Sequence, residues 1–137
     1  MKIFCIGIGG IGLSALARYY KSKGFEVSGS DMSESELTKT LEKEGITVLI
    51  GTNKDHIPKD TDLVVHTAAL ASDHPELLQA KECGMITKTY FEALGEITID
   101  KKTIAVSGTH GKTTTTAMTY NAMKACGINP TVIVGSL

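Results

Sequence analysis

The chain has 137 residues, of which 42% are hydrophobic and 21% are charged, a composition typical of a globular protein with a buried core. Its 14 basic and 15 acidic residues leave a formal charge of −1, which argues against a nucleic-acid partner because such a partner needs a basic face. The sequence contains neither an apolar run of membrane-spanning length nor a signal peptide, so we expect a cytoplasmic protein without a membrane partner.

Short apolar runs alternate with amphipathic stretches over the first hundred residues. Strands are expected at residues 3–6, 25–28, 46–50, 62–66 and 85–87. Helices are expected around residues 13–20 and at 34–44, 75–83 and 91–97. This alternation predicts an α/β fold, a Rossmann-like parallel sheet with helices on both faces and strand order 3-2-1-4-5.

The pattern restarts after a polar linker at residues 98–102. The second part predicts a strand at 103–107, a glycine-bracketed loop at 108–112, a helix at 113–125 and a strand at 131–134. We therefore expect a complete domain over residues 1–97 and, over residues 103–137, the first strand-loop-helix-strand of a P-loop ATPase domain. A unit of about 35 residues cannot bury a core alone, so we expect it to belong to a longer domain.

Three cysteines, Cys5, Cys83 and Cys126, lie far apart in the sequence and in or beside apolar segments. They lack the C-x-x-C spacing of metal sites and redox centres. The sequence therefore predicts buried, reduced thiols.

The first glycine-rich loop, Gly7-Ile8-Gly9-Gly10-Ile11-Gly12, matches the pattern G-x-G-x-x-G between a strand and a helix. In that pattern the first glycine permits a tight turn, the second lets a pyrophosphate approach the backbone, and the third lets the helix pack closely. Ser14 offers a hydroxyl in the first turn, and Asp31 follows the second strand, where an acid usually meets a ribose hydroxyl. The motif predicts a nucleotide pyrophosphate without specifying the nucleotide; the alternative is that the glycines serve packing and Asp31 caps a helix.

The second loop, Gly108-Thr109-His110-Gly111-Lys112-Thr113, resembles a Walker A loop with two instead of four residues between its glycines. Its backbone N–H groups can converge on an anion, Lys112 can reach the β- and γ-phosphates of ATP, and the Thr113 hydroxyl can join a Mg²⁺ shell with help from Thr114. For His110 the sequence leaves two alternatives: a position near phosphate or metal, and a position in solvent. The alternative for the whole loop is a basic turn without a nucleotide.

The segments "GIGGIGLSALA", "VSGSD" and "GTHGKTTTTAM" resemble the Mur ligase family in their order and separations, and the likeness covers essentially the whole chain. This family builds the peptide stem of peptidoglycan. The resemblance implies a UDP-sugar in the first domain rather than NAD. It places Gly9, Gly10, Ile11 and Gly12 around the pyrophosphate. It also places Ser30 and Asp31 near the uridine, and His66, Thr67 and Ala68 along the same crevice.

The resemblance also implies a reaction with UDP-N-acetylmuramate, L-alanine and ATP as partners. ATP would phosphorylate the muramoyl carboxylate, the amine of L-alanine would attack the acyl phosphate, and phosphate would leave. Lys112 would be the catalytic residue that stabilises charge on the transferring phosphoryl group, and Thr113 would help to hold Mg²⁺. The family places its other metal ligands and its amino-acid-binding domain beyond Leu137, so we expect these residues alone to bind the UDP-sugar but not to catalyse ligation.

Three points stay open at this stage. The sequence "HTAAL" at residues 66–70 stands where relatives read more like "SSAI", so His66 has the alternative of a strand-end histidine with a local hydrogen bond. An NAD(H)-binding regulatory Rossmann module is a second reading, since Asp31 also suits NAD, although such a module has no need of the second loop. A Mur-type ligase acting on a larger substrate is the third.

Overall fold

The computed structural model describes residues 1–134 and contains one sheet. Its five parallel strands are β1 (Lys2–Ile6), β2 (Glu26–Asp31), β3 (Thr47–Ile50), β4 (Leu63–His66) and β5 (Ile86–Thr89). They lie in the order β3-β2-β1-β4-β5, which confirms the predicted order 3-2-1-4-5. Ile6 at the end of β1 pairs with Ser30 on one side and His66 on the other, so the carboxyl ends of three strands meet at one edge.

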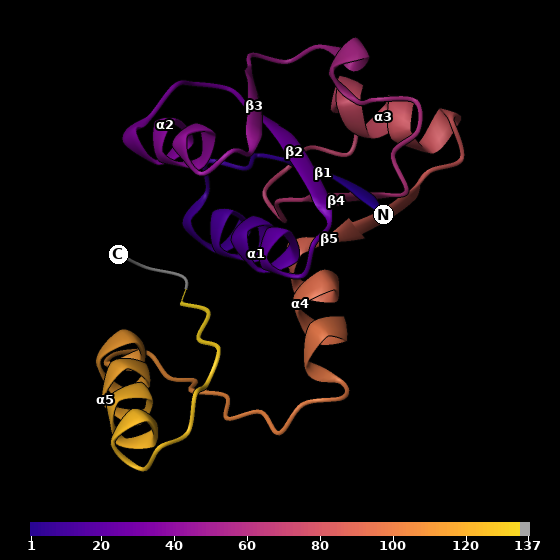
Figure 1. Cartoon of the computed structure of the whole chain (residues 1–137). Coiled ribbons are helices and arrows are strands. Elements are labelled where there is room, and N and C mark those ends of the chain that lie inside the picture. The colour runs from indigo at the N-terminus through magenta and orange to yellow at the C-terminus, as the bar shows by residue number, and fades with distance from the viewer. Residues whose placement is uncertain (135–137) are drawn as a thin grey trace.

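Helices cover both faces of this sheet, as the sequence predicted. They are α1 (Ile11–Ser22), α2 (Glu36–Lys43), the short 3-10 helix η1 (Lys54–His56), α3 (Pro75–Glu82) and α4 (Tyr90–Thr98). Figure 1 shows α1 and α3 on opposite sides of the sheet.

Successive side chains of β1 alternate between two buried cores. Ile3 and Cys5 pack in the core that includes residues of α1, α2 and α4, whereas Phe4 and Ile6 pack with residues of α3 and with Ile57. A strand buried on both faces explains why β1 is a continuous apolar run in the sequence.

A fifth α-helix, α5 (Lys112–Ala125), lies apart from the sheet beyond the segment that follows α4 (Figure 1). None of its residues is buried. The strands predicted at 103–107 and 131–134 are wrong, because neither segment has the hydrogen-bonded neighbour that a strand needs. An apolar run forms a strand only when another strand satisfies its backbone, and no strand lies beside either segment in the part of the chain that the structure describes.

The prediction of buried thiols is correct for one cysteine of the three. Cys5 is buried in β1, but Cys83 follows α3 and Cys126 follows α5, and both are exposed. Each exposed cysteine is the C-cap residue of its helix, and α5 buries none of its residues. A neighbouring apolar segment was therefore a poor guide to burial at these two positions.

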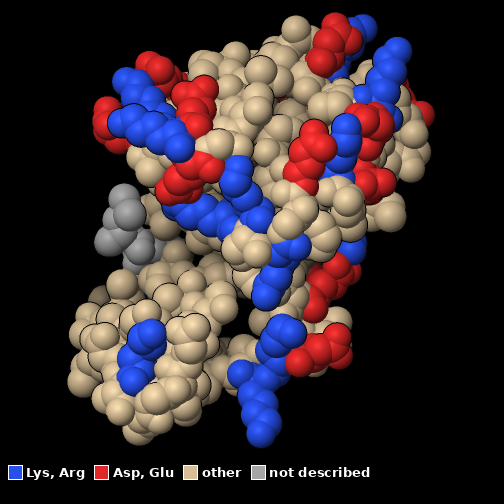
Figure 2. Space-filling model, in the orientation of Figure 1, with Lys and Arg blue, Asp and Glu red and all other residues tan. Residues whose placement is uncertain are grey.

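Charged side chains of both signs alternate over the face shown in Figure 2, most densely around the sheet. This mixture agrees with the nearly balanced composition of 14 basic and 15 acidic residues. Among residues 1–134, no helix combines the length and the apolar character needed to cross a bilayer.

Candidate functional site

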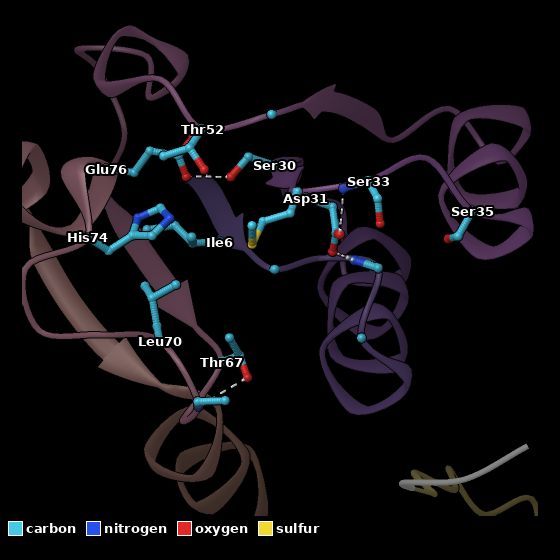
Figure 3. A pocket seen from close by; sticks show the side chains of 16 residues that line it. Ile6, Ser30, Asp31, Ser33, Ser35, Thr52, Thr67, Leu70, His74 and Glu76 are labelled. Atoms are coloured by element: carbon cyan, nitrogen blue, oxygen red, sulfur yellow. Dashed lines mark hydrogen bonds between the residues drawn. The ribbon is translucent and has the colours of Figure 1, made fainter.

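A cavity of about 470 Å³ opens at the carboxyl ends of the strands (Figure 3). Its wall combines the loop after β1, the ends of β2 and β3, the loop after β4 and the start of α3. The residues predicted from the sequence that line it are Gly9, Gly10, Ser30, Asp31 and Thr67. Open parallel sheets bind ligands at this edge, so the position of the cavity fits a binding site.

The glycine loop is hydrogen-bonded to the end of β2. The N–H groups of Gly7 and Ile8 donate to the Ser30 carbonyl at 2.8 and 2.9 Å, and the Gly10 N–H closes a turn on the Gly7 carbonyl at 3.0 Å. Gly7 has a φ of +83°, a conformation that favours glycine. The first glycine therefore has the role in a tight turn that the motif predicted.

Asp31 lies against the loop, although 22 positions separate it from Gly9. Its Oδ2 accepts from the Gly9 N–H at 2.8 Å, and its Oδ1 accepts from the Ser33 N–H at 3.3 Å. A Cβ on Gly9 would lie 2.7 Å from that Oδ2. In this structure the Asp31 carboxylate makes the close approach to Gly9 that the motif reserves for a pyrophosphate.

The other residues predicted in and after the loop serve helix α1. A Cβ on Gly12 would lie 2.9 Å from the Tyr90 ring, so Gly12 lets α1 approach α4. Ser14 is buried, and its hydroxyl donates to the Ile11 carbonyl at 2.9 Å, within the helix. Ile11, Gly12 and Ser14 are outside the cavity lining.

The loop after β4 contributes Thr67 and Ala69 to the cavity, but not His66 or Ala68. The Nδ1 of His66 lies 3.0 Å from the Thr67 carbonyl oxygen, a local hydrogen bond of the kind that the alternative reading of His66 described. Ala68 is exposed.

Sequence reasoning missed several residues of the wall, above all Glu76 in the first turn of α3. Only 1% of Glu76 is exposed, although acids are usually at the surface. An acid in a first helical turn is ordinary in sequence, and nothing in the pattern signalled its burial. Gly51, Thr52 and His74 also line the cavity, and the Nδ1 of His74 is buried without a hydrogen-bond partner.

No lysine or arginine lines this cavity within residues 1–134. Helix α1 begins at Ile11 after Gly10, and no side chain caps its first turn. Its free N–H groups and the positive end of its dipole come directly after the lining residue Gly10, so this end of the cavity suits a phosphate.

The second loop begins α5. Gly111, the N-cap residue, has a φ of +75°, and no side chain caps this helix either. Lys112 folds back, and its Nζ donates to the Gly108 carbonyl at 2.7 Å and the Thr109 carbonyl at 3.4 Å. The lysine ammonium group, the uncapped start of the helix and the glycines of the loop thus lie together, which is the arrangement that a phosphate site requires.

The remaining predicted residues of this loop, His110, Thr113 and Thr114, are exposed. Thr113 directly follows Lys112 in the first turn of α5. Within residues 1–134, no group of three or more His, Cys, Asp or Glu side chains is placed to hold a metal ion.

A family model described as "Mur ligase family, catalytic domain" matches residues 2–102. The chain belongs to the Mur ligase family. The match covers the sheet and its glycine loop, so the family resemblance seen in the sequence is confirmed.

Relatives in this family are similar over nearly the whole chain. UDP-N-acetylmuramate–L-alanine ligase of Carboxydothermus hydrogenoformans is 47% identical over 98% of the chain and 29% of the relative. The enzyme of the same name from Caldicellulosiruptor saccharolyticus is 49% identical over 98% of the chain and 30% of the relative. The chain therefore spans about 30% of the length of these curated relatives.

Solved structures of Mur ligases share the fold. The UDP-N-acetylmuramate–alanine ligase MurC of Thermotoga maritima superposes with a TM-score of 0.93 at 38% identity, covering 100% of this chain and 32% of that one. The UDP-N-acetylmuramate:L-alanyl-γ-D-glutamyl-meso-diaminopimelate ligase (MPL) from Neisseria meningitides superposes with a TM-score of 0.91 at 29% identity, covering 99% of this chain and 43% of that one.

Proposed function

We propose that the chain is the N-terminal part of an ATP-dependent ligase that joins L-alanine to the carboxylate of UDP-N-acetylmuramate in peptidoglycan synthesis. The observation that carries the proposal is the cavity at the carboxyl ends of the strands, with the glycine loop and Asp31 in its wall. Relatives named for this reaction at 47–49% identity support the choice of substrate.

Residues 1–97 would bind the UDP-sugar, with Gly9 and Gly10 around the pyrophosphate and Asp31 near the uridine. Residues 98–102 would be a linker, and residues 103–137 would begin the ATP-binding domain. The N–H groups at the start of α1 support this division, because they offer donors to a pyrophosphate without any basic side chain.

ATP and Mg²⁺ would be held at the second loop. ATP supplies the phosphoryl group that activates the carboxylate. Lys112 is already placed at the loop through the Gly108 carbonyl, so its ammonium group can neutralise phosphate charge there, and Thr113 offers a hydroxyl to Mg²⁺. The uncapped start of α5 supports this assignment.

Two other functions are weaker. An NAD(H)-binding module accounts for Asp31 and the first loop but leaves the second loop without a role. A murein peptide ligase (MPL) shares the fold, but the solved enzymes with that name are 29–31% identical to this chain, below the L-alanine ligases.

Calorimetric titration of the chain with UDP-N-acetylmuramate, and in parallel with NADH, tests the proposal. We expect saturable binding of the UDP-sugar and none of NADH, because the cavity would fit the diphosphate and sugar of that ligand. Binding of NADH alone would overturn the proposal. A ligation assay with ATP and L-alanine is expected to show no product from these 137 residues.

A further inference from the structure

The buried carboxylate of Glu76, a residue of the cavity wall, accepts three hydrogen bonds. Its Oε2 accepts from the Ser30 hydroxyl at 2.5 Å, and its Oε1 accepts from the His56 Nδ1 at 2.9 Å and the Asn53 N–H at 3.3 Å. Figure 3 shows the Glu76 and Ser30 side chains pointing toward one another across the wall. Three separate segments are thus joined at one carboxylate.

A buried charge is costly unless hydrogen bonds satisfy it, and a well-packed apolar residue often stabilises a fold as well. Within residues 1–134, Glu76 is the only acidic or basic residue classed as buried. Stability alone is therefore a weak reason for a glutamate here. The position of its partners suggests what the charge does.

Ser30 connects Glu76 to the glycine loop. Its side chain is held by Glu76, while its carbonyl accepts from the N–H groups of Gly7 and Ile8. The next residue, Asp31, accepts from the Gly9 N–H. Consequently, a shift of Ser30 would move the backbone of Gly7 and Ile8, and with it the loop whose glycines line the cavity.

We infer that Glu76 is a positioning residue that holds the glycine loop in its ligand-binding conformation through Ser30. It acts on the loop without touching the phosphate. Binding gains from such preorganisation because the loop is ordered before the ligand arrives. The identity of the ligand, a UDP-sugar, rests on the proposed function.

The test is a double-mutant cycle in the full chain with UDP-N-acetylmuramate as the probe in calorimetry. Ser30→Ala removes the hydroxyl, and Glu76→Gln keeps the size of the side chain but removes its charge. Each substitution is expected to weaken binding about tenfold, the effect of one lost hydrogen bond to a charged group. The double variant is expected to bind no more weakly than Ser30→Ala, because both act through one contact.

Leu77→Ala is the matched control, since Leu77 is buried in the same turn of α3 but packs in the core. It is expected to lower the melting temperature while leaving the affinity of the folded protein unchanged. The positioning role would be overturned if the affinity losses of the two single substitutions multiplied in the double variant. An equal affinity loss in Leu77→Ala would overturn it as well.

A measurement without ligand separates this inference from the proposed function. Hydrogen exchange of the Gly7 and Ile8 amides is expected to be faster in Glu76→Gln than in the unsubstituted chain, while exchange in β5 is unchanged. Equal exchange at the two loop amides would overturn the inference whatever the chain binds. Failure of the unsubstituted chain to bind the UDP-sugar would instead overturn the proposed function.

Discussion

At the residue scale, the candidate site depends on a few contacts between residues far apart in sequence. Asp31 bonds to Gly9, and Glu76 bonds to Ser30, over separations of 22 and 46 positions. The first contact joins two residues that the motif had singled out separately. The second involves a residue that no motif indicated.

Gly9→Ala is expected to weaken UDP-sugar binding at least about tenfold, comparable to losing a hydrogen bond to a charged group. A Cβ at this position would meet the Asp31 carboxylate and Thr38, at 2.7 and 3.0 Å, so the loop or Asp31 must move. Calorimetry on the folded variant measures the effect, with circular dichroism to check the fold.

Gly95→Ala is the control for that experiment. A Cβ there meets no atom within 4 Å, and the position is inside α4. It is expected to leave binding unchanged and to stabilise the fold by up to about 1 kcal/mol, the usual preference of a helix for alanine. Unchanged affinity in Gly9→Ala would show that the Asp31 contact is dispensable.

The three thiols are expected to differ in reactivity. Burial raises the pKa of Cys5 to about 12, so almost no thiolate forms there at pH 8, whereas Cys83 and Cys126 are exposed. Iodoacetamide should therefore alkylate two cysteines in the native chain and the third only after unfolding, as mass spectrometry can count. Native alkylation of Cys5 at a similar rate would mean that the core opens readily.

At the scale of elements, both ends of each helix were predicted to within about two residues, whereas strand lengths were predicted less well. Two helices begin with capping boxes, Ser35 with Thr38 at α2 and Thr89 with Glu92 at α4. In each, local side chains satisfy backbone N–H groups, so the start is encoded nearby. Strand lengths depend on pairing partners elsewhere; β2, for example, extends to Asp31, beyond the predicted 25–28.

Glu92→Gln is expected to destabilise the fold at neutral pH, and progressively less as the pH falls below about 4. Two hydrogen bonds hold the pKa of the Glu92 carboxyl below its ordinary value. The larger effect comes from the Thr89 backbone N–H and the next from the Thr89 hydroxyl. The stabilisation is thus present above the unfolded pKa of about 4.3 and is lost as pH falls through the lower folded pKa. Thermal unfolding at several pH values measures the difference.

The control for this prediction is Glu36→Gln in the first turn of α2. Glu36 is not part of the capping box there, which uses Thr38. We expect a smaller loss at neutral pH. If the two substitutions behaved alike across the pH range, the Thr89 contact would not be the source of the effect.

At the scale of the whole molecule, the structure divides into a region with two cores and a region with almost none. Every residue of the two core clusters lies within the first 93 positions, whereas α5 buries no residue. Residues 131–133 do lie beside α1, where they line a small hollow with Tyr19. The second region therefore touches the first without sharing its core.

A chain shortened to residues 1–102 is expected to fold and to melt within a few degrees of the full chain. Loss of about 1 kcal/mol would shift the midpoint by about 4–8 °C in a domain of this size, so the comparison is sensitive. Amides of α5 should also exchange faster than those of α1. A large drop in melting temperature would show that residues 103–134 stabilise the sheet.

The sequence alone determined the order of the strands, the layers of helices and both glycine loops. These features follow from local periodicity, from the handedness of parallel connections and from glycines whose backbone geometry other residues avoid. Family membership followed from the same loops. Each of these signals is contained in a short stretch of chain, which is why it can be read without a structure.

Only the tertiary structure decided how the wall of the cavity is built and where the pattern of strands stops. Glu76 became a buried acceptor because α3 brings it to Ser30, a residue 46 positions away in the sequence. Residues 103–107 have the composition of a strand but no neighbour to bond with. Hydrogen-bond partners from distant segments decide these outcomes, and periodicity within one segment carries no information about them.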